Sequence, residues 1–559
     1  MSVSIPSSVI ALWSIYELVF YASEAHNWDD FPLQVTFENE DTQIALDAYW
    51  DGDNVWKVRF TPTKTGTWEW EASSRDSKLN GLSGRIDCIK PEEDQIAENP
   101  NLRGHLRISP NGRYFTYTDG TPFLYLGDTC WSMNEERCSV GENQDGPFYV
   151  WMRDRKSKGI TIINHWIFKS EHPAVDGRTY PSSNEGGEPF EIRENEYVFD
   201  KLKPGFYRYV DVRWRALWEN GFVMAGPPTW FCKPKHYANL EQAKNISRYV
   251  MARYGAYNLV WALSGEYSFG EQKKHSPWDE VSAWNKLGSF IAEHNPYKHP
   301  ISIHPGPANY HASSSIDFHN SGWLDHNWLQ TGQYPGGQHR IALWARDDYD
   351  RKPVRPVLRS EGFYEGNNAA NSFHIRYQPW SAFLNGACGD VYGAHAIWTF
   401  NDYDDPRSIR WGKGDRLDWR EGLKLPGSGH LKHFADFFNS MEWWKLVPFR
   451  EWLRVDGNPP PMPTEDDITP PHCAVERGKV YVIYIPQGNR DKTISVTYLG
   501  RKEYKARWYN PRNGVYSDIN GGKPMNIDQV DEWTLPSIPD DEDWVVILTR
   551  IAIDRMVRS

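Results

Sequence analysis

Several absences restrict what this chain can be. Its net charge is -12 and no basic stripe or arm is present, which argues against a nucleic-acid or membrane partner. No stretch approaches the roughly 18 uninterrupted apolar residues that a membrane-spanning helix needs. The six cysteines are scattered and form no C-x-x-C motif, so neither a disulfide framework nor a zinc site is expected.

The first residues also lack a secretory signal. Ser8–Ser23 is the segment most similar to one. Glu17 interrupts its apolar stretch, and no basic n-region precedes it because the first basic residue is Lys57. We therefore predict a β-strand in this segment. The sequence leaves the localisation open between the bacterial cytoplasm and, if a leader has been removed, the periplasm.

Motifs for metal, phosphate and serine chemistry are missing too. No H-E-x-x-H occurs, and the acidic loop Asn401–Asp405 lacks the EF-hand spacing and its terminal Glu. The segment Ala262–Glu266 has Leu263 where a G-x-S-x-G elbow requires glycine. We expect no metal and no cofactor.

Aromatic residues, in contrast, are abundant. The 559 residues include 28 Trp, 30 Tyr and 24 Phe. Flat apolar faces with a polar edge suit the faces of sugar rings, although many of these side chains must belong to the core. A chain of this length is too long for one hydrophobic core, so about three domains are expected.

Periodicity divides the chain into three parts. Residues 1–92 alternate with period two between turn signals, as in Leu33–Glu38, and predict an N-terminal β-sandwich. Residues 103–456 alternate strand and helix patterns. The Pro-rich linker Gly457–Pro471 then leads to residues 473–559, which predict a C-terminal β-sandwich.

The middle part predicts a parallel α/β fold, and eight strands with long loops favour a (β/α)8 TIM barrel. A doubly wound sheet is the alternative, but Gly127–Trp131 is not the Gly-rich phosphate turn which that fold would place after its first strand. The expected strands are Pro122–Gly127, Ile160–Trp166, Phe222–Gly226, Asn258–Leu263, His299–His304, His326–Gln330, Arg355–Arg359 and Asp390–Trp398. The expected helices are Pro147–Lys158, Phe206–Asn220, Leu240–Tyr254, Pro277–Asn295 and Asn371–Ala387.

Two glutamates carry the functional prediction. Glu266 ends the apolar run from Asn258, and Glu361 ends the run from Arg355, each beside a glycine. The carboxyl ends of barrel strands are where this fold places its chemistry. Glycoside hydrolysis needs one carboxyl as acid and another as nucleophile or base, so the pair predicts a glycoside hydrolase.

Other polar and aromatic residues at the strand ends are predicted to bind a carbohydrate substrate, because they donate and accept hydrogen bonds or stack on sugar rings. They are Asp128, Trp131, His165, Trp166, Trp230, His304, Trp328, Gln330, His395 and Trp398. Each of them taken alone has an equally good structural explanation.

These segments also resemble a known family. Asp119–Trp131, Leu259–Glu266, Pro353–Glu365 and Val391–Trp398 are similar to the apiosidase-like (β/α)8 glycoside hydrolases, and the resemblance covers the whole barrel. Residues 48–62 and 79–84 resemble the small sandwich that often precedes such barrels. Residues 508–514 resemble a C-terminal, collagen-binding-type sandwich.

The resemblance implies a retaining mechanism. The sequence differs from the family pattern at two positions. Family members that cleave apiose usually carry Asp at the position of Glu266, so the resemblance does not fix the sugar. The related clan usually has Asn at the position of Gly265.

We predict Glu361 as nucleophile, kept ionised by Arg359 and His304 nearby, and Glu266 as acid/base, kept protonated by apolar surroundings and by the charge of its partner. The alternatives are a non-catalytic carbohydrate-binding protein on a decayed barrel, and a polysaccharide lyase that uses Arg359 and His304. Both flanking domains are expected to be structural. A chain lacking residues 473–559 should lose solubility or thermal stability and keep its substrate affinity.

Overall fold

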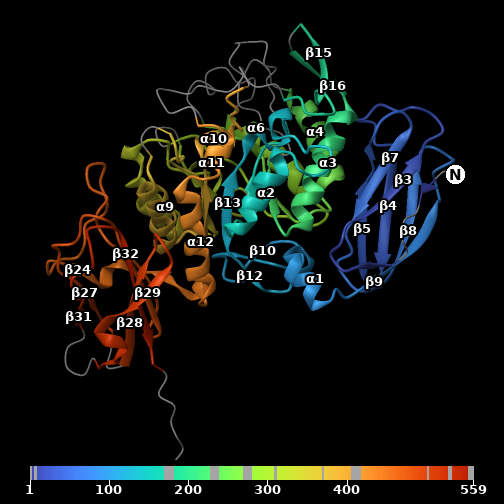
Figure 1. Ribbon diagram of the computed structural model, residues 1–559. Helices are drawn as coiled ribbons and strands as arrows, with labels where there is room; N and C mark the ends of the chain where they lie inside the picture. Colours follow the sequence, from blue (N-terminus) through green and yellow to red (C-terminus); the bar gives the residue numbers. More distant parts are fainter. Residues whose placement is uncertain are drawn as a thin grey trace, which may run out of the picture.

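The computed structural model describes residues 3–4, 9–168, 182–194, 196–226, 238–268, 280–307, 311–367, 370–404, 417–499, 503–526 and 532–551. The chain passes from N-terminal sheets, drawn in blue in Figure 1, through a central barrel to C-terminal sheets drawn in red. The barrel with sheet-rich regions on both sides confirms the predicted fold class.

The N-terminal region is built from two sheets. One has the order β2(Val9–Ala11), β9(Ser83–Ile89), β8(Gly66–Ser74), β4(Leu33–Asn39), β5(Thr42–Asp47), and the other β1(Val3–Ser4), β3(Tyr16–Tyr21), β7(Val55–Phe60), β6(Tyr49–Trp50). Residues along β4 alternate between buried and exposed, as its sequence predicts, and Trp56, Trp68 and Trp70 are core residues. The single strand expected over Ser8–Ser23 is wrong, because β2 and β3 lie in different sheets and Trp13 between them has φ 67°.

Eight parallel strands form the barrel. Their order in the sheet is β19(Ile301–Ser302), β18(Leu259–Ala262), β17(Val223–Gly226), β14(Ile162–Asn164), β13(Tyr125–Thr129), β22(Gly389–Tyr392), β21(Val357–Glu361), β20(Asn327–Gln330). Hydrogen bonds outside the regular ladder bridge the gap between β19 and β20. The Asp325 amide donates to Ile301 O at 2.9 Å, and Ser302 Oγ donates to His326 O at 2.8 Å.

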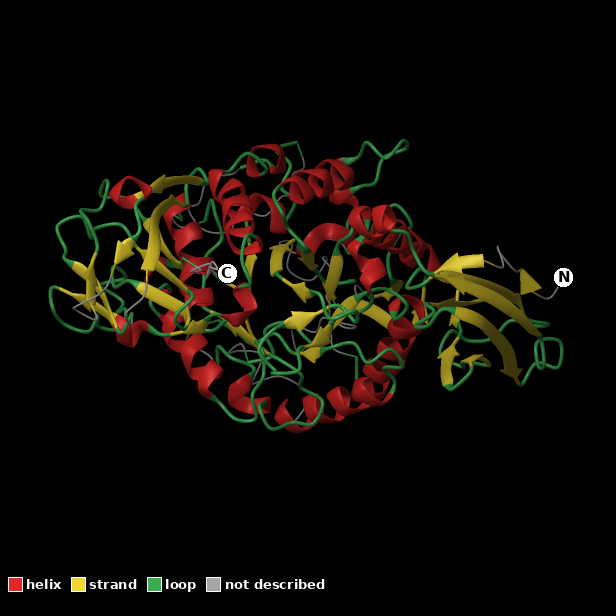
Figure 2. Cartoon of the chain, turned by 90° about the horizontal axis from the view of Figure 1, so that it is seen from below, coloured by secondary structure: helices red, strands yellow, loops and turns green. Residues whose placement is uncertain are grey.

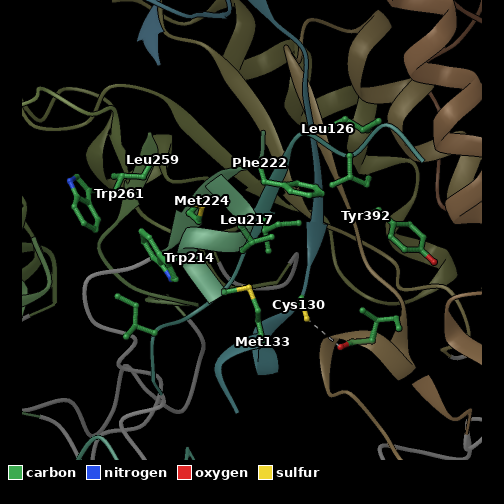
Figure 3. Close-up of a cluster of buried hydrophobic side chains, with 14 of the residues drawn as sticks. Leu126, Cys130, Met133, Trp214, Leu217, Phe222, Met224, Leu259, Trp261 and Tyr392 are labelled. Atoms are coloured by element: carbon green, nitrogen blue, oxygen red, sulfur yellow. Dashed lines mark hydrogen bonds between the residues drawn. The ribbon is translucent and has the colours of Figure 1, made fainter. Parts of the chain in front are cut away.

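Helices lie around the strands when the molecule is seen from below (Figure 2). The longer ones are α2(Pro147–Ser157), α3(Pro204–Glu219), α4(Leu240–Tyr254), α6(Glu280–Glu293), α8(Arg340–Asp350), α9(Ser372–Leu384) and α12(Pro426–Asn439), and the short ones are α1(Glu93–Glu98), α7(Ser315–Phe318), α10(His395–Trp398) and α11(Trp419–Gly422). The sequence analysis did not predict α8 and α12. Helix α4 begins at a capping box between Asn239 and Gln242. Helix α3 packs Trp214 and Leu217 into one hydrophobic cluster with Met224 of the barrel (Figure 3).

Two predicted barrel strands differ from the observed ones. The eighth strand ends at Tyr392, and His395–Trp398, expected as its continuation, forms α10. The first strand begins at Tyr125, since Pro122–Phe123 is β12 of a small sheet with β10(Arg107–Ile108) and β11(Phe115–Thr116). Phe115 and Phe123 of this sheet share a buried cluster with barrel residues such as Tyr125 and Val223. The small sheet therefore closes the amino-terminal end of the barrel, and the site must lie at the other end.

The C-terminal region also has two sheets. The larger has the order β23(Val447–Pro448), β25(His472–Glu476), β26(Val480–Ile485), β32(Trp544–Arg550), β28(Glu503–Asn510), β29(Val515–Asp518), with β30(Met525–Asn526) paired to β28. The smaller has the order β24(Leu453–Val455), β27(Ile494–Thr497), β31(Glu532–Thr534). Strands β23 and β24 precede the Pro-rich linker, so these sheets begin before the domain boundary predicted at residue 456.

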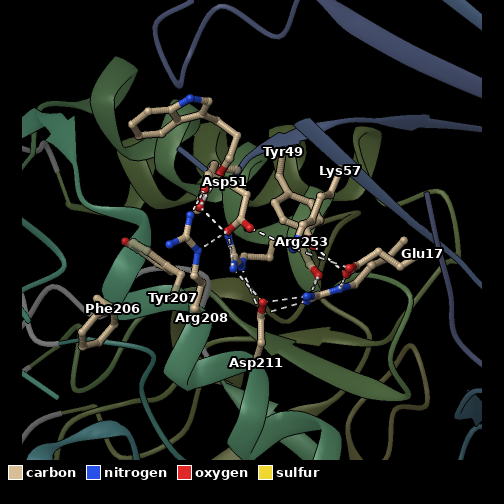
Figure 4. Close-up of polar contacts among 12 residues, drawn as sticks. Glu17, Tyr49, Asp51, Lys57, Phe206, Tyr207, Arg208, Asp211 and Arg253 are labelled. Atoms are coloured by element: carbon tan, nitrogen blue, oxygen red, sulfur yellow. Dashed lines mark hydrogen bonds and ion pairs between the residues drawn. The ribbon is translucent and has the colours of Figure 1, made fainter. Parts of the chain in front are cut away.

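Buried charges join the N-terminal sheets to the barrel (Figure 4). Arg59 of β7 and Arg253 of α4 both contact Asp211 of α3, each at 2.6 Å. Although burial opposes it, the guanidinium groups of Arg253 and Arg59 lower the pKa of Asp211. Arg253 also contacts Asp51 at 3.0 Å, and Arg59 contacts Glu17 at 2.7 Å. The arrangement fixes these sheets to the outer face of α3 and α4.

The C-terminal sheets pack on α9 through a second buried set. Arg376 of α9 forms an ion pair with Asp543 at 2.5 Å, and the Tyr484 hydroxyl of β26 donates to Asp543 at 3.0 Å. The rings of Trp380 and Tyr484 stack with their centroids 5.6 Å apart. All four side chains are buried.

Replacing Asp543 by Ala should therefore lower the free energy of unfolding by about 3–5 kcal/mol, because Arg376 would remain buried without its counter-charge. Chemical denaturation measures this change, and kcat/KM of the folded variant should be unaffected. Asp436→Ala on α12, which breaks an exposed pair with Lys432, is the control and should cost less than about 1 kcal/mol. Equal stability of the two variants would contradict a structural role for this contact.

Candidate active site

The two glutamates lie at the same end of the barrel. Glu361 is the last residue of β21, and Glu266 follows β18 by four residues. Between them in space is Gln330, which ends β20 and has Glu361 as its partner in the parallel ladder. This is the carboxyl-terminal edge, where barrels of this type place their catalytic groups.

Glu266 sits in an environment that favours its protonated form. Gln330 Nε2 donates to Glu266 Oε1 at 2.9 Å. Burial and the nearby charge of Glu361 raise the pKa of Glu266 to about 7, while Gln330 and His304 oppose the shift. Glu266 also has φ 47°, a left-handed conformation that is rare for residues with a side chain and is often found at functional sites.

Glu361 is held at both carboxylate oxygens. His304 Nε2 lies 2.9 Å from Oε2, and Gln333 Nε2 donates to Oε1 at 2.6 Å. Asn367 Nδ2 donates to Gln333 Oε1 at 3.2 Å and so orients that amide. Only 4% of Glu361 is exposed. The contacts of the two glutamates therefore differ, since Glu361 is contacted at both oxygens and Glu266 accepts from Gln330 at one.

An aromatic wall stands beside the carboxyls. The rings of Trp131 and Trp166 stack with centroids 5.4 Å apart, and Trp398 packs against them. Trp131 Nε1 donates to the hydroxyl of Tyr364 at 3.1 Å. The centroid of Trp131 lies 5.9 Å from that of His304, so the wall adjoins the residue that contacts Glu361.

Some predicted substrate-binding residues lie elsewhere. Asp128 is completely buried and forms an ion pair with Arg155 at 2.6 Å, so it fixes α2 to the barrel and does not face a ligand. Trp328 lies in the cluster that fills the barrel interior and donates from Nε1 to His326 at 2.7 Å. These contacts give both residues a structural role, and their contact with substrate stays a prediction.

His165 also points away from the carboxyls. It is fully buried and its ring meets Trp214 of α3 edge-on at 5.2 Å, and burial lowers its pKa to about 4. Its packing is structural as well, and its contact with substrate stays a prediction. His395 lies on α10, where it accepts a hydrogen bond from Trp398 at 3.3 Å. Trp230 lies outside the described residues.

The structure adds residues that the sequence analysis did not select. These residues are Gln333, Tyr364 and Ser360. Each lies within a few positions of Gln330 or Glu361, and this closeness was the only feature of the sequence that could have identified them. Arg359, predicted near the carboxylate of Glu361, pairs instead with Asp390 inside the barrel. Of the two residues predicted to lie near Glu361, only His304 contacts it.

The described residues contain neither a metal-binding cluster nor a membrane-spanning helix. No group of three or more His, Cys, Asp or Glu side chains there is placed to hold a metal ion. Within the same ranges, no helix has the length and apolarity to cross a membrane.

Family models match three parts of the chain. The "Apiosidase-like, catalytic domain" matches residues 109–445, which is more than half of the chain. A domain of unknown function (DUF5060) matches residues 10–75. The "Putative collagen-binding domain of a collagenase" matches residues 464–549. A search among curated proteins finds no match.

Solved structures share the fold. A structure described as a "putative glycoside hydrolase" from Bacteroides vulgatus is 17% identical, with a TM-score of 0.71 over 98% of this chain and 100% of that chain. A family 5 glycoside hydrolase from the same organism is 18% identical, with a TM-score of 0.64 over 81% of this chain and 95% of that one. A further glycoside hydrolase is 19% identical, with a TM-score of 0.64 over 81% and 98%. With the barrel matched along its length, the chain belongs to the apiosidase-like family and is a glycoside hydrolase.

Proposed function

We propose that this barrel cleaves a poly- or oligosaccharide by a retaining, two-carboxylate mechanism in which Glu361 is the nucleophile and Glu266 the acid/base. One observation carries the proposal. Two carboxyls share one edge of the barrel; burial and the charge of Glu361 raise the pKa of Glu266, and Glu361 is contacted at both carboxylate oxygens by His304 and Gln333. A pair of titratable groups whose environments differ in this way is typical of acid/base assignments in glycosidases.

The first step uses both groups at once. Glu361 attacks the anomeric carbon and forms an ester, while Glu266 gives its proton to the departing glycosidic oxygen. Formation of the ester removes the charge of Glu361, which is one cause of the raised pKa of Glu266. The pKa of Glu266 then falls, and the ionised carboxylate can take a proton from the water that hydrolyses the ester. The charge coupling thus switches Glu266 from acid to base.

The surrounding residues position the two carboxyls and the sugar. Gln330 orients Glu266, and Gln333 with His304 orients Glu361. Trp131 and Trp166 provide an apolar wall for the face of a sugar ring.

The residue that the lyase alternative would use to bind a substrate carboxylate is already paired within the protein. That alternative requires Arg359 to hold a substrate carboxylate, but Arg359 is 2% exposed and already paired with Asp390. His304, the other group it would use, contacts Glu361. Nothing in the described site favours the decayed barrel, since both glutamates keep hydrogen-bonding partners.

A substrate panel tests the reaction class. It should contain aryl glycosides, including an aryl apioside, together with pectic, arabinan and marine polysaccharides. Release of reducing ends or of the aryl group supports the proposal. An unsaturated product that absorbs in the ultraviolet would identify a lyase, and binding without turnover would identify a decayed barrel.

The pH profile gives a separate prediction. Because Glu266 must be protonated in the first step and its pKa is about 7, kcat/KM should fall as the pH rises through about 7. Removing the charge of its partner by Glu361→Gln should lower the pKa of Glu266, because the charge of Glu361 raises it. Carbon-13 NMR of labelled glutamate carboxyls measures both values. A Glu266 pKa that stays the same in the variant would contradict the charge coupling.

A further inference from the structure

His304 is attached to both halves of the site. Its side chain is fully buried and lies between Glu361, 2.9 Å from Nε2, and Ser360, whose Oγ is 3.1 Å from Nδ1. Its backbone amide donates to Ser264 O at 3.0 Å, and its carbonyl accepts from the Tyr267 amide at 3.2 Å. The residue therefore braces the loop that carries Glu266 while its ring contacts Glu361.

The hydroxyl of Ser360 determines which ring nitrogens carry protons. A serine hydroxyl has a single hydrogen, and Ser360 Oγ is placed to donate it to the carbonyl of Leu329 at 3.0 Å. A carbonyl can only accept, so a hydroxyl that donates to Leu329 has no hydrogen left for His304. Ser360 can then only accept from Nδ1 of His304, which must carry a hydrogen.

The other nitrogen faces an acceptor too. Glu361 in its ionised form has no hydrogen to give, so Nε2 must also carry one to make the 2.9 Å contact. A histidine that donates from both nitrogens is an imidazolium. Among the described residues, the titratable side chains facing this ring are Glu361 and Glu266, with Tyr364 reaching Glu361. Its ring neighbours Trp131 and Trp328 do not titrate.

We propose that His304 is a positioning residue that stays an imidazolium through the reaction and makes Glu361 a better leaving group in the second step. The proposal rests on the proposed function of Glu361. When the ester forms, Glu361 loses its charge and the imidazolium remains beside it. When water breaks the ester, a carboxylate forms against a positive charge already in place, which stabilises it.

Kinetics should show this second-step role. In His304→Gln the amide can still donate to Glu361 but carries no charge, so hydrolysis of the ester should slow more than its formation. On an activated aryl glycoside we expect kcat to fall about 10²-fold and KM to fall with it, with a burst of aryl release as the ester accumulates. A rise in KM with unchanged kcat would overturn the proposal.

The protonation state can be read without turnover. In the full chain labelled with nitrogen-15 histidine, the His304 signals are identified by their loss in His304→Gln. Both ring nitrogens should be protonated at a pH where Glu361 is ionised. Ser360→Ala removes an acceptor, so the titration of His304 should move to lower pH. Ser302→Ala, which removes a buried hydroxyl bonded to His326, is the matched control and should leave it unchanged.

Two NMR results would contradict the protonation state proposed for His304. A ring with one protonated nitrogen, or a shift to higher pH in Ser360→Ala, would show that Ser360 donates to a neutral histidine and would overturn the proposal. These signals do not depend on activity. Failure of every substrate in the panel would contradict the proposed function, whatever the protonation of His304.

Discussion

Glu361→Gln should lower kcat/KM by about 10⁴-fold or more, because the amide keeps the shape of the side chain but cannot attack the anomeric carbon. Steady-state kinetics on the best substrate of the panel measures the loss, and an activated aryl glycoside should give no burst with this variant. The amide still fits between His304 and Gln333, so the fold should be retained. Residual activity within about 100-fold of the parent enzyme would exclude Glu361 as nucleophile.

Glu365→Gln provides the matched control for that variant. Glu365 is also buried, at 2% exposure, but its oxygens accept from the Gly427 amide and the Tyr392 hydroxyl, each at 2.8 Å. It is thus a buried glutamate near the same strand with a structural role. We expect some loss of stability and less than about a 10-fold loss of kcat/KM. A comparable loss in both variants would mean that the effect of Glu361→Gln comes from general damage to the barrel.

The second large effect concerns Glu266. Glu266→Ala removes the proton donor, so hydrolysis of natural glycosides should fall about 10²–10⁴-fold. An aryl glycoside with a good leaving group needs no proton, and its ester with Glu361 should still form. Azide can enter the space left by the side chain and attack that ester without a general base. The product should be a glycosyl azide with the configuration of the substrate.

The same reagent distinguishes the reverse assignment. If azide restores turnover in a Glu361→Ala variant and gives a glycosyl azide with the configuration of the substrate, Glu361 is the acid/base and Glu266 the nucleophile. A glycosyl azide of inverted configuration from that variant would instead support Glu361 as the nucleophile. Gln330→Ala is a useful comparison, since it removes the hydrogen bond to Glu266 Oε1 but leaves the carboxyl. It should reduce activity without making the enzyme responsive to azide.

The sequence was sufficient for the positions of the two glutamates. Each ends an apolar run beside a glycine, and in a parallel barrel such positions converge on one edge. The direction of the neighbouring side chains was not predictable in the same way. Asp128 and Trp328 lie within β13 and β20, near the strand ends that carry the site residues, but one faces α2 and the other fills the barrel. Alternation separates these cases only when the register is known.

The sequence analysis also did not predict which loop residues contact the site. Gln333 reaches Glu361 from the segment after β20, and no pattern marks it as different from other glutamines. His395–Trp398 was read as strand because its apolar residues continue those of β22. A short helix starts there instead, and this places Trp398 against Trp131 and Trp166. Arg359 was expected beside Glu361, but Asp390 on the adjacent strand offers a buried counter-charge.

Trapping of the covalent intermediate tests the central claim most directly. A 2-deoxy-2-fluoro glycoside of the sugar that the panel identifies, with a good leaving group, should slow both steps and leave the sugar attached to the enzyme. Mass spectrometry of a protease digest should then find the added mass on the peptide that contains Glu361, and on that residue after fragmentation. A label on Glu266, or rapid hydrolysis to a product of inverted configuration without any label, would contradict the account.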